Sequence, residues 1–147
     1  MAVSYKPAEH QNVIPYLVVP DAEKEMRLLK EVFDATELHV SRDPQGGIAH
    51  ASLKVGDSVV MLGQSSEQWP PQPCSIYVYV PDVDATYRRA LAFGATSVRE
   101  PVDQFYGDRS GGVQSANRVQ WWLGTHIEDV SSEEIDRRMQ EMYKKTA

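Results

Sequence analysis

Cysteine, basic charge and long apolar runs are all scarce in this sequence, and each shortage excludes a class of protein. The single cysteine, Cys74, rules out an intramolecular disulfide and a cysteine-rich zinc site. Lys and Arg number 15 against 21 Asp and Glu, a formal net charge of -6, so no basic stripe is available for a phosphate backbone. No apolar run reaches the roughly 18 residues that a membrane-spanning helix needs. We therefore expect no nucleic-acid partner and no membrane partner.

The beginning of the chain, MAVSYKPAEHQ, has no apolar stretch of the kind found in secretory signals, and we expect a cytoplasmic protein. The length of 147 residues suits one domain with a substantial buried core. Hydrophobic residues make up 41% of the chain and charged residues 24%, which is typical of a globular fold.

Two segments of the chain are similar to each other. Residues 14–38, IPYLVVPDAEKEMRLLKEVFDATEL, resemble residues 75–98, SIYVYVPDVDATYRRALAFGATSV. In each segment, strand-type residues lead into Val-Pro-Asp, then a helical stretch, then Ala-Thr. The offset is 61 residues between Pro20 and Pro81 and 60 between Ala35 and Ala95. Two copies of this kind predict two structural modules rather than a solenoid.

Each copy predicts a strand followed by an amphipathic helix. Residues 13–19 are rich in β-branched and aromatic types, as in a strand, and Pro20 ends it. Asp21 and Asp82 stand where helix N-caps are expected. Apolar residues then recur at helical spacing in both copies, and Gly94 suits the C-terminal cap of the second helix.

Short strands follow each helix. We predict strands over 37–42, 48–55 and 58–62 in the first copy and over 97–100, 107–114 and 119–125 in the second. The fold class is therefore α+β, with the order βαβββ occurring twice. The last hairpin, Gln114 to Val119, lacks Pro and Gly, so we assign its left-handed position to Asn117.

The predicted organisation is a single domain over residues 1–147, with module one at about 12–63 and module two at about 74–127. A linker over 64–73, with three prolines in its last four positions, joins them. Ser131 and Glu134 form a capping box for a final helix at about 131–145. Apolar residues at 135, 139 and 142 give this helix a narrow stripe, which would dock on the domain or on a partner subunit.

Several motifs resemble a known family. The opening PYLVVPDAEKEMRLLKEVF, the segment GDSVVML, the run DQFYGDRSGGV and the stretch WWLGTHIEDVSSEEIDRRM, together with the βαβββ repeat, are similar to small bacterial glyoxalase-like proteins. These proteins belong to the glyoxalase/bleomycin-resistance/extradiol-dioxygenase superfamily, also called the vicinal oxygen chelate superfamily. The resemblance covers Val13 to Met139.

The resemblance implies a fold more strongly than an activity. It implies that the two modules form a cupped, barrel-like mixed sheet with helices outside, and that the protein is a homodimer. Isomerases, dioxygenases, thiol transferases and non-catalytic drug binders all share this scaffold, so the fold does not choose among these activities.

In metal-dependent members of this superfamily, the first and last strands of each module offer His or Glu to one divalent cation, which chelates vicinal oxygens of the substrate. The resemblance places those positions at Ile14, Met61, Ser75 and Trp122. None is a ligand of the usual type, and a register shift of one adds only Cys74, a lone thiol. We therefore expect no metal and no cofactor, and a metal-dependent enzyme is less expected than a binding protein.

Strand alternation predicts which side chains line the concave faces of the modules. If the four positions above face inward, the same faces also carry Tyr16, Val18, Val59, Tyr77, Tyr79 and Gln120. Aromatic rings with a few polar tips are the usual lining of a small-molecule site. The alternative is that some of these rings fill the cup as core.

His50 is the first candidate for contact with a ligand. In IAHASLKV, His50 and Ser52 share one face of the predicted strand and apolar residues occupy the other, so both should lie on the concave side. An imidazole titrates near neutrality, which suits hydrogen bonding to a ligand or general-base catalysis. The alternative is a structural histidine bonded to a neighbouring strand.

His126 and Arg109 have two interpretations each. His126 either closes one end of a cup or anchors the C-terminal segment through Glu128 or Asp129. A non-standard metal site that combines His50 and His126 with a carboxylate such as Asp108 is a further alternative. Arg109, which lies among glycines, either binds a ligand carboxylate or phosphate or pairs with an internal Asp.

Three functions remain open from the sequence. The first is a metal-free protein that holds an aromatic or antibiotic-like small molecule in a cupped sheet, as bleomycin-resistance-like members do. The second is a metal-dependent glyoxalase-like or dioxygenase-like enzyme with a non-standard site. The third is a dimeric interaction protein without a ligand.

Overall fold

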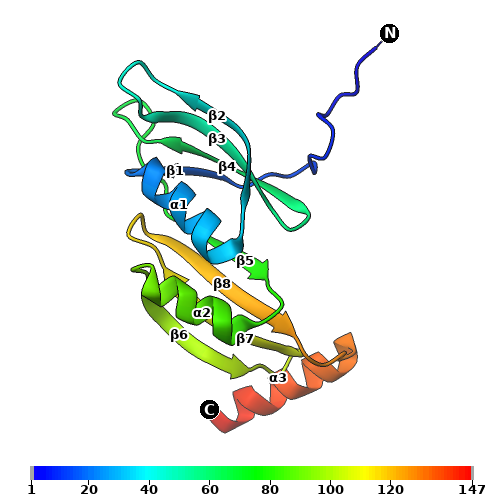
Figure 1. Cartoon of the computed structure of the whole chain (residues 1–147). Helices are drawn as coiled ribbons and strands as arrows, with labels where there is room; N and C mark the ends of the chain where they lie inside the picture. Colours follow the sequence, from blue (N-terminus) through cyan, green and yellow to red (C-terminus); the bar gives the residue numbers. More distant parts are fainter. Residues whose placement is uncertain (1, 147) are drawn as a thin grey trace. The chain divides into compact units, whose positions relative to one another are not determined.

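The computed structural model describes residues 2–146 and divides the chain into two compact units. The first unit contains the chain up to Cys74 together with Ser115–Val119, and the second contains Ser75–Gln114 and the chain from Gln120 onward. Each unit carries a four-stranded sheet with a helix lying across one face (Figure 1).

The first unit holds β1 (Tyr16–Val19), α1 (Ala22–Phe33), β2 (Thr36–Arg42), β3 (Ile48–Val55) and β4 (Ser58–Gln64). The strands lie in the order β1-β4-β3-β2. β1 runs parallel to β4, and the other neighbours are antiparallel.

The second unit repeats this plan with β5 (Cys74–Tyr79), α2 (Val83–Ala92), β6 (Thr96–Asp103), β7 (Asp108–Gln114) and β8 (Val119–His126). The strand order, β5-β8-β7-β6, is the same as in the first sheet. The predicted α+β class and the repeated βαβββ order are therefore confirmed.

Two details of the predicted sheets are wrong. Neither sheet closes into a barrel, because each is open with its first and second strands at the edges. The first strand begins at Tyr16, not Val13, because pairing with β4 starts at Tyr16 and Met61. Val13 remains 85% exposed, so no burial draws it into the sheet.

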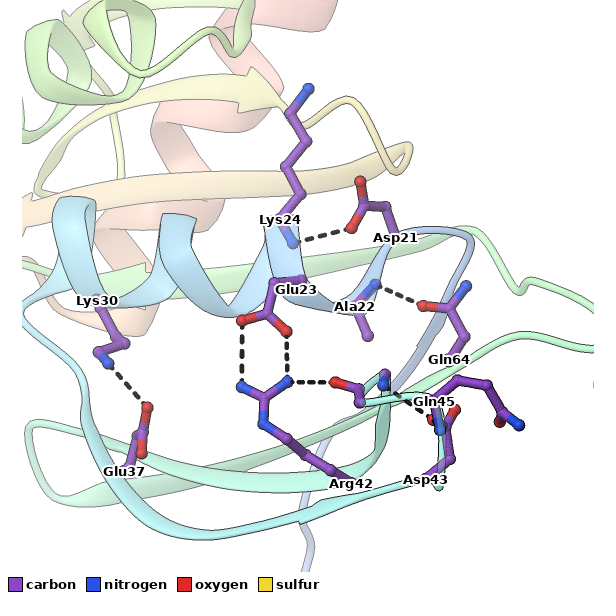
Figure 2. Close-up of polar contacts among 12 residues, drawn as sticks. Asp21, Ala22, Glu23, Lys24, Lys30, Glu37, Arg42, Asp43, Gln45 and Gln64 are labelled. Atoms are coloured by element: carbon purple, nitrogen blue, oxygen red, sulfur yellow. Dashed lines mark hydrogen bonds and ion pairs between the residues drawn. The ribbon is translucent and has the colours of Figure 1, made fainter.

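The beginning of α1 is held by side chains as well as by its own backbone. The Asp21 carboxylate accepts a hydrogen bond from the Lys24 N–H, so the predicted N-cap is confirmed. Gln64, at the end of β4, accepts from the Ala22 N–H and donates to the Pro20 carbonyl. Figure 2 shows the bonds of Lys24 to Asp21 and of Ala22 to Gln64 beside the paired hydrogen bonds of Arg42 to Glu23, which tie β2 to α1.

One face of each sheet packs on its helix and forms the core. In the first unit, Met26, Leu29 and Val32 of α1 are buried, as are Leu17 and Leu53 of the sheet. In the second unit the buried residues are Val83, Tyr87 and Ala90 of α2 and Val113, Trp121 and Leu123 of β7 and β8. The opposite face of each sheet is therefore left for other contacts.

The hairpin between β7 and β8 turns differently from the prediction. Arg118, with φ 64°, takes the left-handed conformation that we assigned to Asn117. The Asn117 side chain is instead used in hydrogen bonding: it accepts from the Asp21 N–H and donates to the Asp21 carbonyl and to Glu25 Oε2. A residue with three such bonds is fixed by its contacts and not by its turn preference.

The final helix, α3 (Ser132–Thr146), starts as predicted, because Ser131 Oγ accepts a hydrogen bond from the Glu134 N–H. None of its residues is buried. Arg138 ties it to the second unit through the Phe105 carbonyl at 3.0 Å and Glu128 at 2.8 Å. No helix among the described residues is long and apolar enough to cross a bilayer.

Candidate functional site

The first unit contains a cavity of about 460 Å³ on its sheet. Its lining consists of side chains from β1, β3, β4 and the segment after β4: Tyr16, Val18, Ala49, Gly63, Gln64 and Trp69. Gly63 makes room for the tyrosine, because a Cβ at this position would lie 3.1 Å from Tyr16 Oη and 3.0 Å from the Ala49 carbonyl. The absent side chain thus leaves the ring of Tyr16 free to lie over β4.

Trp69 reaches the cavity from a turn that the sequence suggested only as a linker. The Ser66 N–H donates to the Trp69 carbonyl at 2.8 Å, and the Trp69 N–H donates to Ser66 Oγ at 3.0 Å. Further on, the Gln72 N–H donates to the Val18 carbonyl of β1 at 3.1 Å. The segment is therefore attached to β1, and it holds a tryptophan that is 66% exposed beside the cavity.

Tyr16 is the first of three polar side chains that form a hydrogen-bonded chain. Tyr16 Oη lies 3.1 Å from His50 Nδ1, and His50 Nε2 lies 3.1 Å from Ser52 Oγ. The neighbours Ala51 and Leu53 are fully buried on the helix side, so His50 and Ser52 occupy the face away from α1. The two rings of Tyr16 and His50 are also in contact, with centroids 5.6 Å apart. In this arrangement a proton can move along the hydrogen bonds from Ser52 through His50 to the hydroxyl of Tyr16.

The positions that correspond to metal ligands in the metal-dependent relatives do not form a metal site. Met61 pairs with Tyr16 and Ser52, which places these three residues in one row across the sheet, but a thioether is a poor ligand for a hard divalent cation. Ile14 precedes β1 and has no donor atom in its side chain. No group of three His, Cys, Asp or Glu suited to hold a metal ion occurs within residues 2–146. The residue types present do not fit such a cation.

A second polar cluster lies in the second unit, around Asp108. Its carboxylate is only 3% exposed and accepts hydrogen bonds from Tyr77 Oη at 2.7 Å and Tyr79 Oη at 2.8 Å. His126 Nδ1 lies 2.9 Å from the other carboxylate oxygen, and His126 Nε2 lies 2.7 Å from Asp129 Oδ1. The buried charge is thus fully surrounded by donors.

Hydrogen bonding sets the protonation of this cluster. Burial by itself would raise the pKa of Asp108, but the bonds from His126, Tyr77 and Tyr79 bring that pKa below its ordinary value. The bond to Asp108, followed by the bond to Asp129, raises the pKa of His126. Burial and then the bond to Asp108 raise the pKa of Tyr77, and the bond to Asp108 raises that of Tyr79. The same hydrogen bonds therefore favour the protonated form of His126 and the ionised form of Asp108.

The tyrosine–glycine contact of the first unit is repeated in the second. Tyr77 and Gly124 follow Tyr16 and Gly63 by the same 61 residues as the sequence repeat. A Cβ at Gly124 would lie 2.2 Å from Tyr77 Oη and 2.7 Å from its Cζ. Both modules therefore use a glycine of their last strand to seat a tyrosine of their first strand.

The remaining predicted site residues lie in three different places. Gln120 bonds to Ser75 at 3.2 Å and to Gln114 at 3.3 Å. Trp122 lies against Gly112 and under the guanidinium of Arg99. Arg109 bonds to Asp84 of α2 at 2.8 Å and 3.0 Å, and to Asp103 at 3.0 Å. Arg109 therefore lies on the helix side of its sheet, apart from the other residues predicted to bind a ligand.

Sequence reasoning missed several residues of these sites. Trp69 was overlooked because it lies within the predicted proline-rich linker, although a tryptophan in a linker is a signal in itself. Gly63 and Gly124 stand at matching places of the repeat, and this coincidence could have identified them. Arg99 carried no local signal, because its contacts are with residues far along the chain.

Comparison with known proteins agrees with the fold and the repeat. A sequence model of the Glyoxalase/Bleomycin resistance protein/Dioxygenase superfamily matches residues 10–123. An uncharacterized protein of Mycobacterium bovis, Mb0911c, is 35% identical over 150 aligned residues, which cover 95% of this chain and 96% of that protein. Two modules of βαβββ order define this class of protein, and the chain belongs to the glyoxalase/bleomycin resistance protein/dioxygenase superfamily.

Two solved structures are similar to most of the chain. The crystal structure of TioX from Micromonospora sp. ML1 has a TM-score of 0.68 and 25% sequence identity, and covers 80% of this chain and 99% of that one. Fosfomycin resistance protein FosX from Mesorhizobium loti has a TM-score of 0.58 and 23% identity, with 82% of this chain and 95% of that one covered. The second similarity supports the fold alone.

Proposed function

We propose that this protein binds a small, partly aromatic organic molecule, without a metal ion, in the cavity between Tyr16 and Trp69 of the first unit. The observation that carries the proposal is this cavity itself, whose volume of about 460 Å³ lies within the range usual for small-molecule sites. Two aromatic side chains at its edge are half exposed or more, at 50% for Tyr16 and 66% for Trp69. Exposed rings at a concavity favour a planar, apolar partner.

The polar residues behind the cavity suit the orientation of such a ligand. The Tyr16 hydroxyl is bonded to His50, which is bonded to Ser52. The hydroxyl can therefore donate or accept a hydrogen bond, according to the ligand. Gln64 is occupied by its bonds to Ala22 and Pro20 and contributes shape. In this proposal Tyr16 and Trp69 hold the ring of the ligand, and His50 with Ser52 supports one hydrogen bond to it.

The homodimer and the cytoplasmic location that we expect from the sequence are part of the same proposal. The apolar stripe of α3 includes Met142, whose 47% exposure is consistent with a subunit contact. Light scattering coupled to size-exclusion chromatography of the whole chain tests the dimer, and fractionation of the native cells tests the location.

Fluorine NMR of protein labelled with 5-fluorotryptophan tests the cavity. The chain has three tryptophans, and Trp121 is 1% exposed, so it serves as an internal reference. Titration with the neutral probes indole and quinoline should shift the Trp69 signal to saturation and leave that of Trp121 in place. Tyr16→Ala should weaken binding about tenfold or more, because a buried aromatic contact contributes on the order of 1–3 kcal/mol.

Tyr143→Ala is the matched control for the tyrosine substitution, since Tyr143 is 65% exposed on α3. It should leave the titration unchanged. An unsaturable drift of all three tryptophan signals, or equal binding in Tyr16→Ala and wild type, would refute a site in the cavity. One divalent metal per chain that is lost in His50→Ala would instead favour the metal-dependent alternative.

A further inference from the structure

Arg99, in β6, has no counter-ion among the described residues of the second unit. Its Nη2 donates to Ser110 Oγ at 2.9 Å and to the Ser110 carbonyl at 3.3 Å. Its Nε is the one buried side-chain nitrogen or oxygen of residues 2–146 that has no hydrogen-bond partner. Arg109, by contrast, has its charge met by two carboxylates. An unpaired donor on a buried group is costly and calls for an explanation.

The guanidinium is held in place although it lacks an anion. Its Cζ lies 5.1 Å from the centroid of the Trp122 ring, within the range of a cation–π contact. The ring itself lies flat on β7, because a Cβ at Gly112 would come within 2.7 Å of it. Trp122 and Ser110 thus fix the guanidinium from two sides, so that little side-chain entropy would be lost when a further group binds.

The carboxylate of Asp108, which lies in the same strand as Ser110, is not available to balance the charge. Asp108 stands two residues before Ser110 in β7, but its oxygens already accept from Tyr77, Tyr79 and His126. Among the described residues of the second unit, no carboxylate forms an ion pair with Arg99, whereas Arg109 and His126 each have carboxylate partners. Nη1 also has no partner among these residues, and it is not among the buried atoms, so it remains open to an incoming acceptor.

We infer that Arg99, stacked on Trp122 and bonded to Ser110, is a binding site for the oxyanion group of a small molecule, either a carboxylate or a phosphate. A guanidinium offers parallel N–H donors that match two oxygens of such a group, and an anion would supply the missing counter-charge. This site belongs to the second unit, and it does not depend on whether the cavity of the first unit binds a ligand.

The protein labelled with 5-fluorotryptophan tests this site with charged probes. Inorganic phosphate and benzoate are titrated separately, with sodium chloride at matched ionic strength as the reference for general salt effects. The Trp122 signal should shift to saturation with at least one of the two probes and not with chloride. Saturation by benzoate alone identifies a carboxylate ligand, by phosphate alone a phosphorylated ligand, and by both a general oxyanion site.

Arg99→Gln should weaken this binding by about tenfold or more, as expected for the loss of a charge-assisted hydrogen bond. Arg42→Gln, which removes an arginine paired with Glu23 in the first unit, is the matched control and should bind as wild type. An unchanged Trp121 signal verifies that Arg99→Gln is folded. If this variant does not fold, two other measurements replace it. One is the titration of Arg99→Lys, and the other is the shift of the Arg99 Nε–H resonance when the probes are added to the wild type.

Two results would overturn the inference. One is the absence of any saturable shift beyond that caused by chloride. The other is an equal response in Arg99→Gln and wild type, which would assign the shift to salt. A melting temperature that rises more in phosphate than in chloride supports the inference only if Arg99→Gln loses the difference, because phosphate also stabilises proteins without binding.

Discussion

At two positions the lack of a side chain shapes these sites as much as the side chains around it. The hydroxyl of Tyr77 reaches the buried carboxylate of Asp108 only because Gly124 has no side chain. The same relation holds between Tyr16 and Gly63 in the first unit, although there the space is less tight. A glycine in the interior of a strand usually weakens it, so two glycines at matching positions indicate a common requirement.

Substitution of Gly124 by Ala tests this requirement. The new Cβ would lie 2.2 Å from Tyr77 Oη, so the ring must move and its bond to Asp108 must break. We expect a loss of about 1–3 kcal/mol in the free energy of unfolding, measured by urea denaturation. In a Tyr77→Ala background the same substitution should cost much less. Equal costs in both backgrounds would show that Tyr77 and Gly124 are not coupled.

The His126–Asp108 pair predicts a dependence of stability on pH. Because the pKa of His126 is raised above its ordinary value, its bond contributes stability that is fully present below about pH 6.5 and is lost as the pH rises through the folded-state pKa. Because the pKa of Asp108 is lowered, its ionised form contributes stability that is fully present above about pH 3.9. This stability is lost as the pH falls through the folded-state pKa of Asp108.

Proton NMR titration of the His126 ring in wild type and in Asp108→Asn measures the first effect. The pKa of His126 should be higher in wild type and should fall in the variant, with a remainder due to Asp129. His39, which bonds to Ser41 outside this cluster, is the internal control, and its ring signals should not differ between the two proteins. The assignment fails if the pKa of His126 does not change on loss of the Asp108 charge.

Among the elements, the turn between β7 and β8 is held by side-chain hydrogen bonds to the beginning of α1. Asn117 there makes three hydrogen bonds, two to the backbone of Asp21 and one to the carboxylate of Glu25, which is 1% exposed. Asn117→Ala should therefore lower the free energy of unfolding by about 1–3 kcal/mol in urea. Asn12→Ala, at an exposed residue bonded to the Tyr5 hydroxyl, should have no measurable effect. If Asn117→Ala lowers the free energy of unfolding no more than Asn12→Ala does, these bonds are not formed in solution.

Elements determined by local chemistry could be predicted from the sequence, and those determined by distant contacts could not. The caps at Asp21, Asp82 and Ser131 are confirmed, because each depends on residues within one turn. The start of β1 and the attachment of the Trp69 turn depend on pairing with strands far along the chain. The conformation of Arg118 follows from what Asn117 contacts, which no local pattern reveals.

For the whole molecule, the internal repeat predicted the fold and alternation predicted the faces, but neither predicted which polar groups meet. Tyr77 and Tyr79 were expected on one face, and their meeting with Asp108 depends on how β5 and β7 lie across β8. Arg109 was expected either to bind a ligand or to pair with an internal Asp, and in the structure it bonds to Asp84 of α2 and to Asp103. Its role in ligand binding stays a prediction without support from these contacts.

The central claim is that the cavity beside Tyr16 and Trp69 holds an organic ligand without a metal ion. Native mass spectrometry of the untagged protein, purified directly from cells, tests it most directly because it reports subunit number, metal and retained molecules together. We predict an organic adduct of small-molecule mass that is absent from Tyr16→Ala and retained in Tyr143→Ala. A stoichiometric divalent metal, or an adduct equally retained by Tyr16→Ala, would contradict the account.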